Sequence, residues 1–157
     1  LDLGVEESEE FLKSVIVDIN EIVKVTRMSP KKVHIYTSPA WKQRVFDKAT
    51  RMAKDAELSI PAITKATMSD SEMKKHGKEA ADFARKTAEA LMKRSPADIE
   101  RISRPIDELR YLAEASSFIS EEIGCDVAVY SADDPHAYDP QSKAKVSMPR
   151  RPAIYVE

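Results

Sequence analysis

Three short β-forming runs, far apart in a sequence dominated by helical apolar spacing, constrain this fold most. They are Val33 to Thr37 (VHIYT), Asp126 to Tyr130 (DVAVY) and Ala153 to Val156 (AIYV), and all are rich in β-branched or aromatic residues. Three short strands need a covering layer of helices to bury enough apolar surface. We therefore expect an α+β fold, with a small three-stranded sheet packed by several helices and preceded by a long helix.

The long helix is expected near the start of the chain. After an acidic stretch that begins at Glu6, apolar residues recur at the helical period: Phe11, Leu12, Val15, Ile16, Ile19, Ile22 and Val23. Acidic side chains suit the positive N-terminal end of a helix. The helix should end between Arg27 and Pro30, because the residue before a proline avoids the α conformation.

A second helix is predicted directly after the first strand. Ser38 can cap its free N–H groups, and Pro39 at the first helical position loses no hydrogen bond. Its apolar face includes Trp41 and Phe46, which we expect to pack beneath the sheet. Between residues 57 and 68 the apolar spacing weakens and Pro61 interrupts it, so this stretch is predicted to be irregular.

Further helices are expected in the second half of the chain. Ser69 and Glu72 form a capping box, which predicts a helix that continues to Met92. A short turn should follow before Pro105. One helix is then expected over residues 106–123, with Gly124 just past its end. Residues 132–151 are polar and rich in proline, which predicts a long surface loop.

The composition limits the classes of function. The chain has 157 residues, 42% of them hydrophobic, which suits one domain with one core. Its net charge of -2 combines 25 basic with 27 acidic residues, so any RNA contact must come from local patches. The single cysteine, Cys125, excludes an internal disulfide and fits a reducing compartment, so we expect a cytoplasmic protein. No apolar run approaches the roughly 18 residues that cross a bilayer, so no membrane partner is expected.

Residues for catalysis or metal binding show no recognisable spacing. The glycines are isolated, so no phosphate-binding loop can form, and the histidines lack metal-ligand spacing. Cys125 has no nucleophile signature and is interpreted as a small buried residue. Asp133, Asp134 and Asp139 lack the glycine and terminal glutamate of a calcium loop, so we favour a solvated turn. We interpret the chain as a binding or structural module with no catalytic residue, metal site or cofactor.

Segments at both ends of the chain resemble leucyl-tRNA synthetases of the archaeal and eukaryotic-cytosolic type. Val33 to Lys42 (VHIYTSPAWK) is similar to a strand, proline turn and Trp-Lys helix start near the C-terminus of that family. Tyr138 to Lys145 (YDPQSKAK) and Pro149 to Glu157 (PRRPAIYVE) resemble its final segment. The family often has an acidic residue at the position of Ala40 and an aromatic one at that of Gln43, so this helix departs from its pattern.

The resemblance implies that this chain is part of a longer parent protein whose domains have separate functions. The parent would join leucine to its tRNA with ATP and magnesium, in domains outside this chain. Residues 1–30 would be a helix from the end of the anticodon-binding helical bundle, and residues 31–157 the C-terminal tRNA-binding domain. That domain would recognise the long variable arm of leucine tRNA, with the rest of the synthetase as its other partner. The chain alone, which begins with Leu1, is expected to be an inactive piece.

Two basic clusters and the end of the chain are the candidate RNA contacts. The first cluster surrounds the last loop and comprises Lys143, Lys145, Arg150 and Arg151. The second lies at the junction of the first helix and strand and comprises Lys24, Arg27, Lys31 and Lys32. Glu157 would accept hydrogen bonds from a guanine edge, and free backbone groups at Val156 would read a neighbouring base. With 33% charged residues, a solvated charged face remains the alternative for either cluster.

A protein-interaction module that tethers a synthetase to other translation factors is the alternative function. An exposed apolar helix face would favour that function. Binding restricted to tRNA with a long variable arm would favour RNA recognition.

Overall fold

The computed structural model describes residues 3–157, with side chains from residue 5 onward. The chain divides into two compact units. Unit 1 comprises the chain up to Pro39 together with Ile106–Glu157, and unit 2 comprises Ala40–Pro105. Each unit has its own hydrophobic cluster, so the expectation of one core is wrong. The predicted domain boundary at residue 30 concerns the longer parent and stays a prediction; within this chain, the first helix packs in unit 1.

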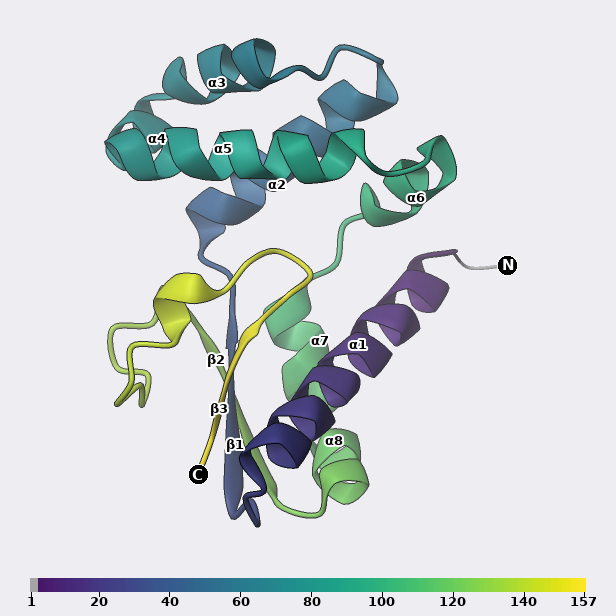
Figure 1. Ribbon diagram of the computed structural model, residues 1–157, viewed down its shortest axis with the longest axis vertical. Helices are drawn as coiled ribbons and strands as arrows, with labels where there is room; N and C mark the ends of the chain where they lie inside the picture. The colour runs from purple at the N-terminus through teal and green to yellow at the C-terminus, as the bar shows by residue number, and fades with distance from the viewer. Residues whose placement is uncertain (1–2) are drawn as a thin grey trace. The chain divides into compact units, whose positions relative to one another are not determined.

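The three predicted strands form one mixed sheet in unit 1 (Figure 1). Strand β1 (Lys32–Thr37) lies in the centre, parallel to β2 (Asp126–Ser131) and antiparallel to β3 (Ala153–Val156). Residues 33–37 are all buried, because β1 has a neighbour on each side and both of its faces are covered. The α+β class and the strand positions predicted from sequence are therefore confirmed.

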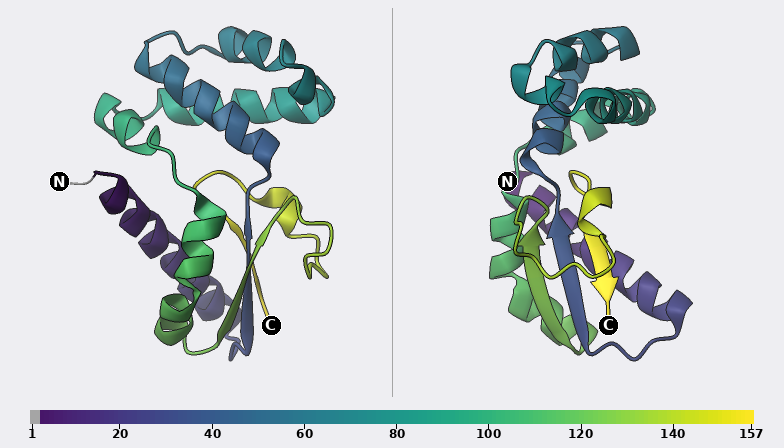
Figure 2. Two further views of the ribbon diagram at one scale, coloured as in Figure 1. Left: turned by 180° about the vertical axis from the view of Figure 1, so that it is seen from behind. Right: turned by 90° about the vertical axis from the view of Figure 1, so that its left-hand side faces the viewer.

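Three helices cover one face of this sheet, as Figures 1 and 2 both show: α1 (Leu3–Thr26), α7 (Glu108–Glu114) and α8 (Ser116–Ile123). The predicted stripe of α1 supplies Phe11, Val15 and Ile19, which pack with Val33 and Ile35 of β1. Burial of these side chains stabilises the unit by about 25 cal/mol per Å2 of apolar surface.

The helix expected over residues 106–123 is divided into α7 and α8 at Ala115, so that prediction is corrected. Asp107 caps α7, because its carboxylate accepts the Arg110 N–H at 3.2 Å. Gly124 ends α8 with a φ of 78°, in the left-handed region that glycine adopts without strain. The predicted C-terminal signal of this segment is confirmed.

The predicted long loop follows β2 and contains one 3-10 turn, η1 (Ala144–Val146). The loop lies on the sheet face opposite the helices (Figure 2). Asp139 stabilises the turn, since its carboxylate accepts the N–H groups of Lys143 at 2.7 Å and Ala144 at 3.0 Å. The Asp134 carboxylate accepts the His136 N–H at 2.8 Å. These two aspartates therefore act as turn residues.

Unit 2 consists of helices: α2 (Ala40–Lys54), α3 (Ile60–Met68), α4 (Ser71–Lys74), α5 (Gly77–Met92) and α6 (Pro96–Ile102). Its core combines Val45, Ile63 and Leu91 with alanines of α2 and α5. Trp41 and Phe46 pack against this core, so the expectation that they lie beneath the sheet is wrong. Both residues do face a helical core, as their spacing on α2 indicated.

Two helix predictions in unit 2 are corrected by the caps. Residues 60–68 are helical instead of irregular, because Ser59 caps α3 through the Ala62 N–H at 3.1 Å and Pro61 lies in the first turn. The single helix expected from Ser69 to Met92 begins one residue later and is divided into α4 and α5 at Lys75 and His76. Its start moves because Asp70 is the cap and accepts the Glu72 N–H at 2.9 Å. Among the described residues, no helix is long and apolar enough to cross a membrane.

Candidate nucleic-acid interface

The pairing of β1 with β3 joins two predicted sites that are far apart in sequence. The Lys31 and Lys32 N–H groups donate to the Glu157 carbonyl at 2.7 and 3.2 Å, and the Glu157 N–H donates to the Lys32 carbonyl at 3.0 Å. The junction lysines and the last residue therefore lie side by side at one end of the sheet. Lys31 is exposed and Lys32 half-buried. This end of the sheet thus brings the backbones of two lysines and one glutamate together.

Val156 presents its backbone at the open edge of the sheet. In an antiparallel pair, hydrogen-bonded and non-hydrogen-bonded residues alternate. Lys32 and Glu157 exchange two hydrogen bonds, so the next pair, Val33 with Val156, is the non-hydrogen-bonded one. Because β3 is an edge strand, the N–H and C=O of Val156 point away from β1. Its side chain is buried in the unit 1 core, which fixes the position of these groups.

A cluster of tyrosines surrounds His34 on the face that the loop covers. The His34 ring is 2% exposed and lies 5.9 Å from the Tyr130 ring, 5.6 Å from Tyr155 and 4.9 Å from Tyr138, measured between centroids. His34 Nδ1 lies 3.2 Å from the Tyr130 hydroxyl. The Tyr36 hydroxyl donates to the Tyr138 carbonyl and so holds the loop against β1. Burial is the main reason that the pKa of Tyr36 is raised, so this donor stays protonated.

The Glu157 carboxylate lies against this cluster. One oxygen is 3.4 Å from His34 Nε2, and the other accepts a long hydrogen bond of 3.4 Å from the Tyr138 hydroxyl. The His34 contact lacks hydrogen-bond geometry, so Nε2 has no hydrogen-bond partner among the residues described. The negative charge of Glu157 is the main cause of the raised pKa of Tyr138. The carboxylate is 38% exposed, which leaves acceptor positions open to a ligand.

Arg150, predicted as a phosphate contact, forms an internal ion pair. Its guanidinium lies 2.7 Å from Glu7 of α1, and the two side chains are 15% and 4% exposed. Its backbone N–H donates to both carboxylate oxygens of Glu108, at 3.1 and 3.2 Å. Arg150 has a φ of 67°, which suits the position after Pro149 in a tight turn. These contacts tie the loop to α1 and α7, so Arg150 is not among the RNA contacts that we propose.

The other predicted basic residues are spread along the loop and α1. Arg151 is exposed, and a backbone bridge with Met148 fixes its place in the chain. Lys145 is exposed in η1 and Lys143 is half-buried just before it. Lys24 lies in the last turn of α1 and Arg27 directly follows the helix, both exposed. No group of three or more metal-ligating side chains lies close enough to hold an ion anywhere from residue 5 onward.

The tyrosines are the part of this surface that sequence reasoning missed. Tyr138 is 50% exposed, whereas Tyr130 and Tyr155 are half-buried. Part of this arrangement could be predicted from the sequence, because side chains two residues apart in a strand share a face. Tyr155 therefore shares a face with Glu157, and His34 shares a face with Tyr36. The sequence could not show that the loop returns Tyr138 to that face.

Comparison with known proteins gives a consistent result along the whole chain. No family model matches. A protein named leucine–tRNA ligase from Methanosarcina acetivorans is 42% identical over 158 aligned positions, which cover 100% of this chain. Proteins of the same name from Methanothrix thermoacetophila and Pyrococcus abyssi are each 35% identical, over 100% and 98% of the chain.

The matched relatives are much longer than this chain. The chain spans 16% of the length of the Methanosarcina and Methanothrix proteins and 14% of that of the Pyrococcus protein. Together with the two terminal signatures, these full-chain matches identify the part of the relatives to which it corresponds. The chain belongs to the leucine–tRNA ligase family and represents the C-terminal region of its archaeal members.

Proposed function

We propose that this region binds leucine tRNA for a leucine–tRNA ligase and recognises the long variable arm. The observation that carries the proposal is the convergence of Lys31, Lys32, Val156 and Glu157 at one end of the sheet. These residues were predicted as RNA contacts separately, from two distant segments. A variable arm is an A-form stem with a loop, so it offers both backbone phosphates and unpaired bases to such a surface.

The groups at this end of the sheet suit different parts of an RNA loop. The two lysines suit phosphates, which fix position without reading sequence. The outward N–H and C=O of Val156 can pair with a base edge, and the Glu157 carboxylate accepts from guanine donors. The exposed ring of Tyr138 offers a stacking surface for an unpaired base. Positioning and base reading would thus occur within one small area.

The activity of the whole protein is part of the same proposal. The relatives are named leucine–tRNA ligases, and we assign the joining of leucine to tRNA, with ATP and magnesium, to domains outside this chain. In this arrangement, the chain adds affinity and tRNA selection to a catalytic site that lies elsewhere in the protein, in the cytoplasm.

The protein-interaction alternative has less support. It calls for a continuous apolar stripe on an exposed helix face. Met92, Leu109 and Phe118 are exposed one each on α5, α7 and α8. On α1 the exposed large hydrophobic residues are Val5, Val17 and Val25, which are 12 and 8 positions apart. At 3.6 residues per turn, side chains separated by these spacings point in different directions around the helix axis. Single exposed apolar residues are normal on protein surfaces.

The direct test is a binding titration with three RNAs: intact leucine tRNA, the same tRNA with its variable arm cut to a few nucleotides, and a long-armed serine tRNA. We expect tight binding only to intact leucine tRNA. Equal affinity for the shortened tRNA would exclude the variable arm as the target. Equal affinity for serine tRNA would show that arm length alone is recognised.

A further inference from the structure

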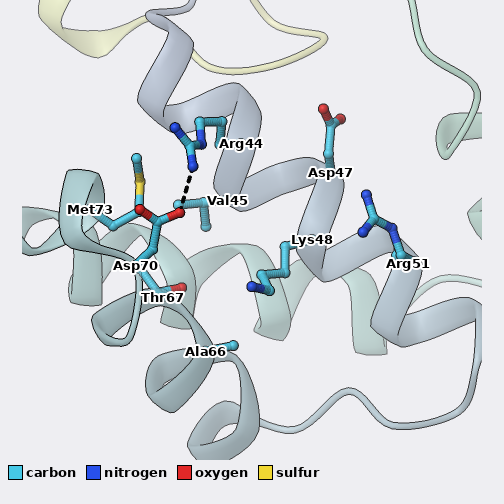
Figure 3. A pocket seen from close by; sticks show the side chains of 9 residues that line it. All are labelled: Arg44, Val45, Asp47, Lys48, Arg51, Ala66, Thr67, Asp70 and Met73. Carbon is cyan, nitrogen blue, oxygen red and sulfur yellow. Dashed lines mark hydrogen bonds and ion pairs between the residues drawn. The ribbon is translucent and has the colours of Figure 1, made fainter.

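A cavity of about 250 Å3 lies in unit 2, between α2 and the segment formed by α3 and α4 (Figure 3). It is smaller than the roughly 300 Å3 at which pockets for drug-sized ligands begin. Its wall is mostly polar, and the charged or polar side chains that line it are Arg44, Asp47, Lys48, Arg51, Thr67 and Asp70. A small, hydrophilic group fits this cavity better than an apolar ligand.

The cavity carries two cations without a partner in the described part of the chain. Arg44 pairs with Asp70 at 2.7 Å, and Asp47 accepts a hydrogen bond from Gln43 at 2.9 Å. Figure 3 shows Lys48 and Arg51 beside the cavity with no such interaction. Lys48 and Arg51 lie three positions apart on the same face of α2 as the paired Arg44, so their like charges repel. A bound anion would relieve that repulsion.

A buried hydroxyl in the cavity wall also lacks a partner. Thr67 is 2% exposed, and its Oγ1 makes no hydrogen bond in the described structure. Two neighbours on the same segment behave differently: Thr64 donates to the Ile60 carbonyl and Ser69 to the Lys65 carbonyl, each at 2.7 Å. This i to i−4 bond is the usual solution for a helical hydroxyl. A buried unsatisfied hydroxyl costs about 1–3 kcal/mol, so its retention calls for a reason.

We propose that this cavity binds a phosphodiester group of the RNA backbone, with Lys48, Arg51 and Thr67 as its ligands. This inference rests on the proposed function, because it adds a second tRNA contact in a different unit from the first. Donors on α2 and a hydroxyl on α3 approach from two sides, which suits the tetrahedral oxygens of phosphate better than a planar carboxylate. Lys48 and Thr67 both line the cavity, and the flexible stem of Lys48 lets its ammonium adjust to a bound oxygen.

The local test is NMR spectroscopy of the 157-residue chain with three separate additions: leucine tRNA, inorganic phosphate and a poly-glutamate peptide. The Thr67 methyl signal and the amides of residues 66–70 report on the cavity, and the amides of Val156 and Glu157 report on the sheet. We expect tRNA to shift both sets, and poly-glutamate to shift neither at the same charge concentration. With millimolar inorganic phosphate we expect weak shifts of the cavity signals only, which would support phosphate binding in the cavity.

The two sets of signals separate the two proposals. Shifts at the sheet without shifts at the cavity overturn the cavity site and leave the proposed function standing. Shifts at the cavity without shifts at the sheet leave the cavity site standing and overturn the sheet residues as the tRNA contact. No shift with tRNA at either place overturns both proposals. If inorganic phosphate shifts the cavity but tRNA does not, the site takes a small anion and the assignment to RNA is wrong. Equal response to poly-glutamate would instead indicate an acidic protein partner.

Substitutions test the residues themselves. The double change Lys48→Ala and Arg51→Ala should lower the slope of log affinity against log salt by about one to two. Lys93→Ala with Arg94→Ala is the matched control, because both residues are exposed in unit 2 and the charge change is the same. Thr67→Val keeps the shape and should weaken tRNA binding about tenfold, as for one hydrogen bond to a charged group, without lowering the unfolding temperature. Unchanged tRNA binding in either test variant, or an equal loss in the control, overturns the site.

Discussion

The two units hold their charged side chains in different ways. In unit 1 the Arg150 guanidinium and the Glu7 carboxylate are both largely buried and lie 2.7 Å apart. In unit 2, Lys54 with Glu100 and Arg85 with Glu89 are between 42% and 54% exposed, and in the Arg44 pair the Asp70 side chain is 24% exposed. Exposed pairs contribute little, whereas breaking a buried pair is costly. A buried ion pair thus stabilises the fold of unit 1, whereas the ion pairs described in unit 2 are more exposed and contribute less.

The cores of the two units also differ in the size of their buried side chains. Unit 2 buries Ala49, Ala80, Ala84 and Ala88 completely, and such small side chains allow helices to approach closely. Unit 1 instead buries large and β-branched residues between a sheet and three helices. Unit 2 is one continuous segment, while unit 1 joins two segments that are more than 60 residues apart. Non-local pairing carries a larger loop-closure cost, so unit 1 depends more on contacts that link distant segments.

The largest expected effect is that of Arg150→Ala. The change removes the Arg150 guanidinium from the buried Glu7 carboxylate, so the free energy of unfolding should fall by about 3–5 kcal/mol. Urea denaturation measures the loss, and amide exchange should accelerate in unit 1 before unit 2. Arg151→Ala is the control, since that neighbouring side chain is exposed. If both substitutions cost the same, the internal ion pair is not what stabilises the loop.

The matching test in unit 2 is Trp41→Ala. The Trp41 ring stacks on His76 at 4.6 Å and meets Phe83 edge to face at 5.6 Å, and it packs against the helical core. Because the ring is only half-buried, we expect the lower end of the range for such truncations, about 3 kcal/mol. Thermal unfolding followed by circular dichroism measures the change, with Trp41→Phe as the milder control. A negligible loss would point instead to a binding role for Trp41.

Local sequence signals predicted the elements well, and their failures have identifiable causes. The strands followed from β-branched runs, and the end of α8 followed from Gly124, since both depend on nearby residues only. Pro61 was interpreted as a breaker, although a proline in the first helical turn loses no hydrogen bond once Ser59 caps the helix. Trp41 was placed beneath the sheet because periodicity shows which face is buried but not against which partner.

The candidate site was predictable as a set of residues but not as a surface. The lysines at 31 and 32 and the residues at 156 and 157 meet only because β3 pairs antiparallel with β1, and strand order is a long-range property. The role of Arg150 was hidden for a similar reason, since its partner Glu7 lies 143 residues away. Thr67 gave no signal at all, because an unsatisfied hydroxyl exists only in the folded state.

At the sheet, Glu157→Ala should weaken binding to leucine tRNA by about 1–3 kcal/mol, the range for one specific base contact. Substitution is preferable to removal of the last two residues, because Val156 packs in the core and its strand must stay paired. Glu122→Ala on α8 is the control, being an exposed carboxylate elsewhere in unit 1. The loss should shrink when the contacted loop base is changed. If it persists with every loop base, the carboxylate positions the RNA and does not read it.

The smallest expected effect is that of Arg151→Ala, and it separates Arg151 from Arg150 most sharply. An exposed arginine that contacts a phosphate contributes through counterion release, so its loss should weaken binding about equally across variable-arm sequences and lower the salt slope by roughly one at most. The folded stability should not change, in contrast to Arg150→Ala. Arg110→Ala, an exposed arginine on α7, gives the matched charge control.

Should Arg151→Ala leave both affinity and salt slope as they are, the loop cluster makes no phosphate contact there. Electrostatic binding would then come from the remaining basic residues of the two clusters and from the cavity of unit 2.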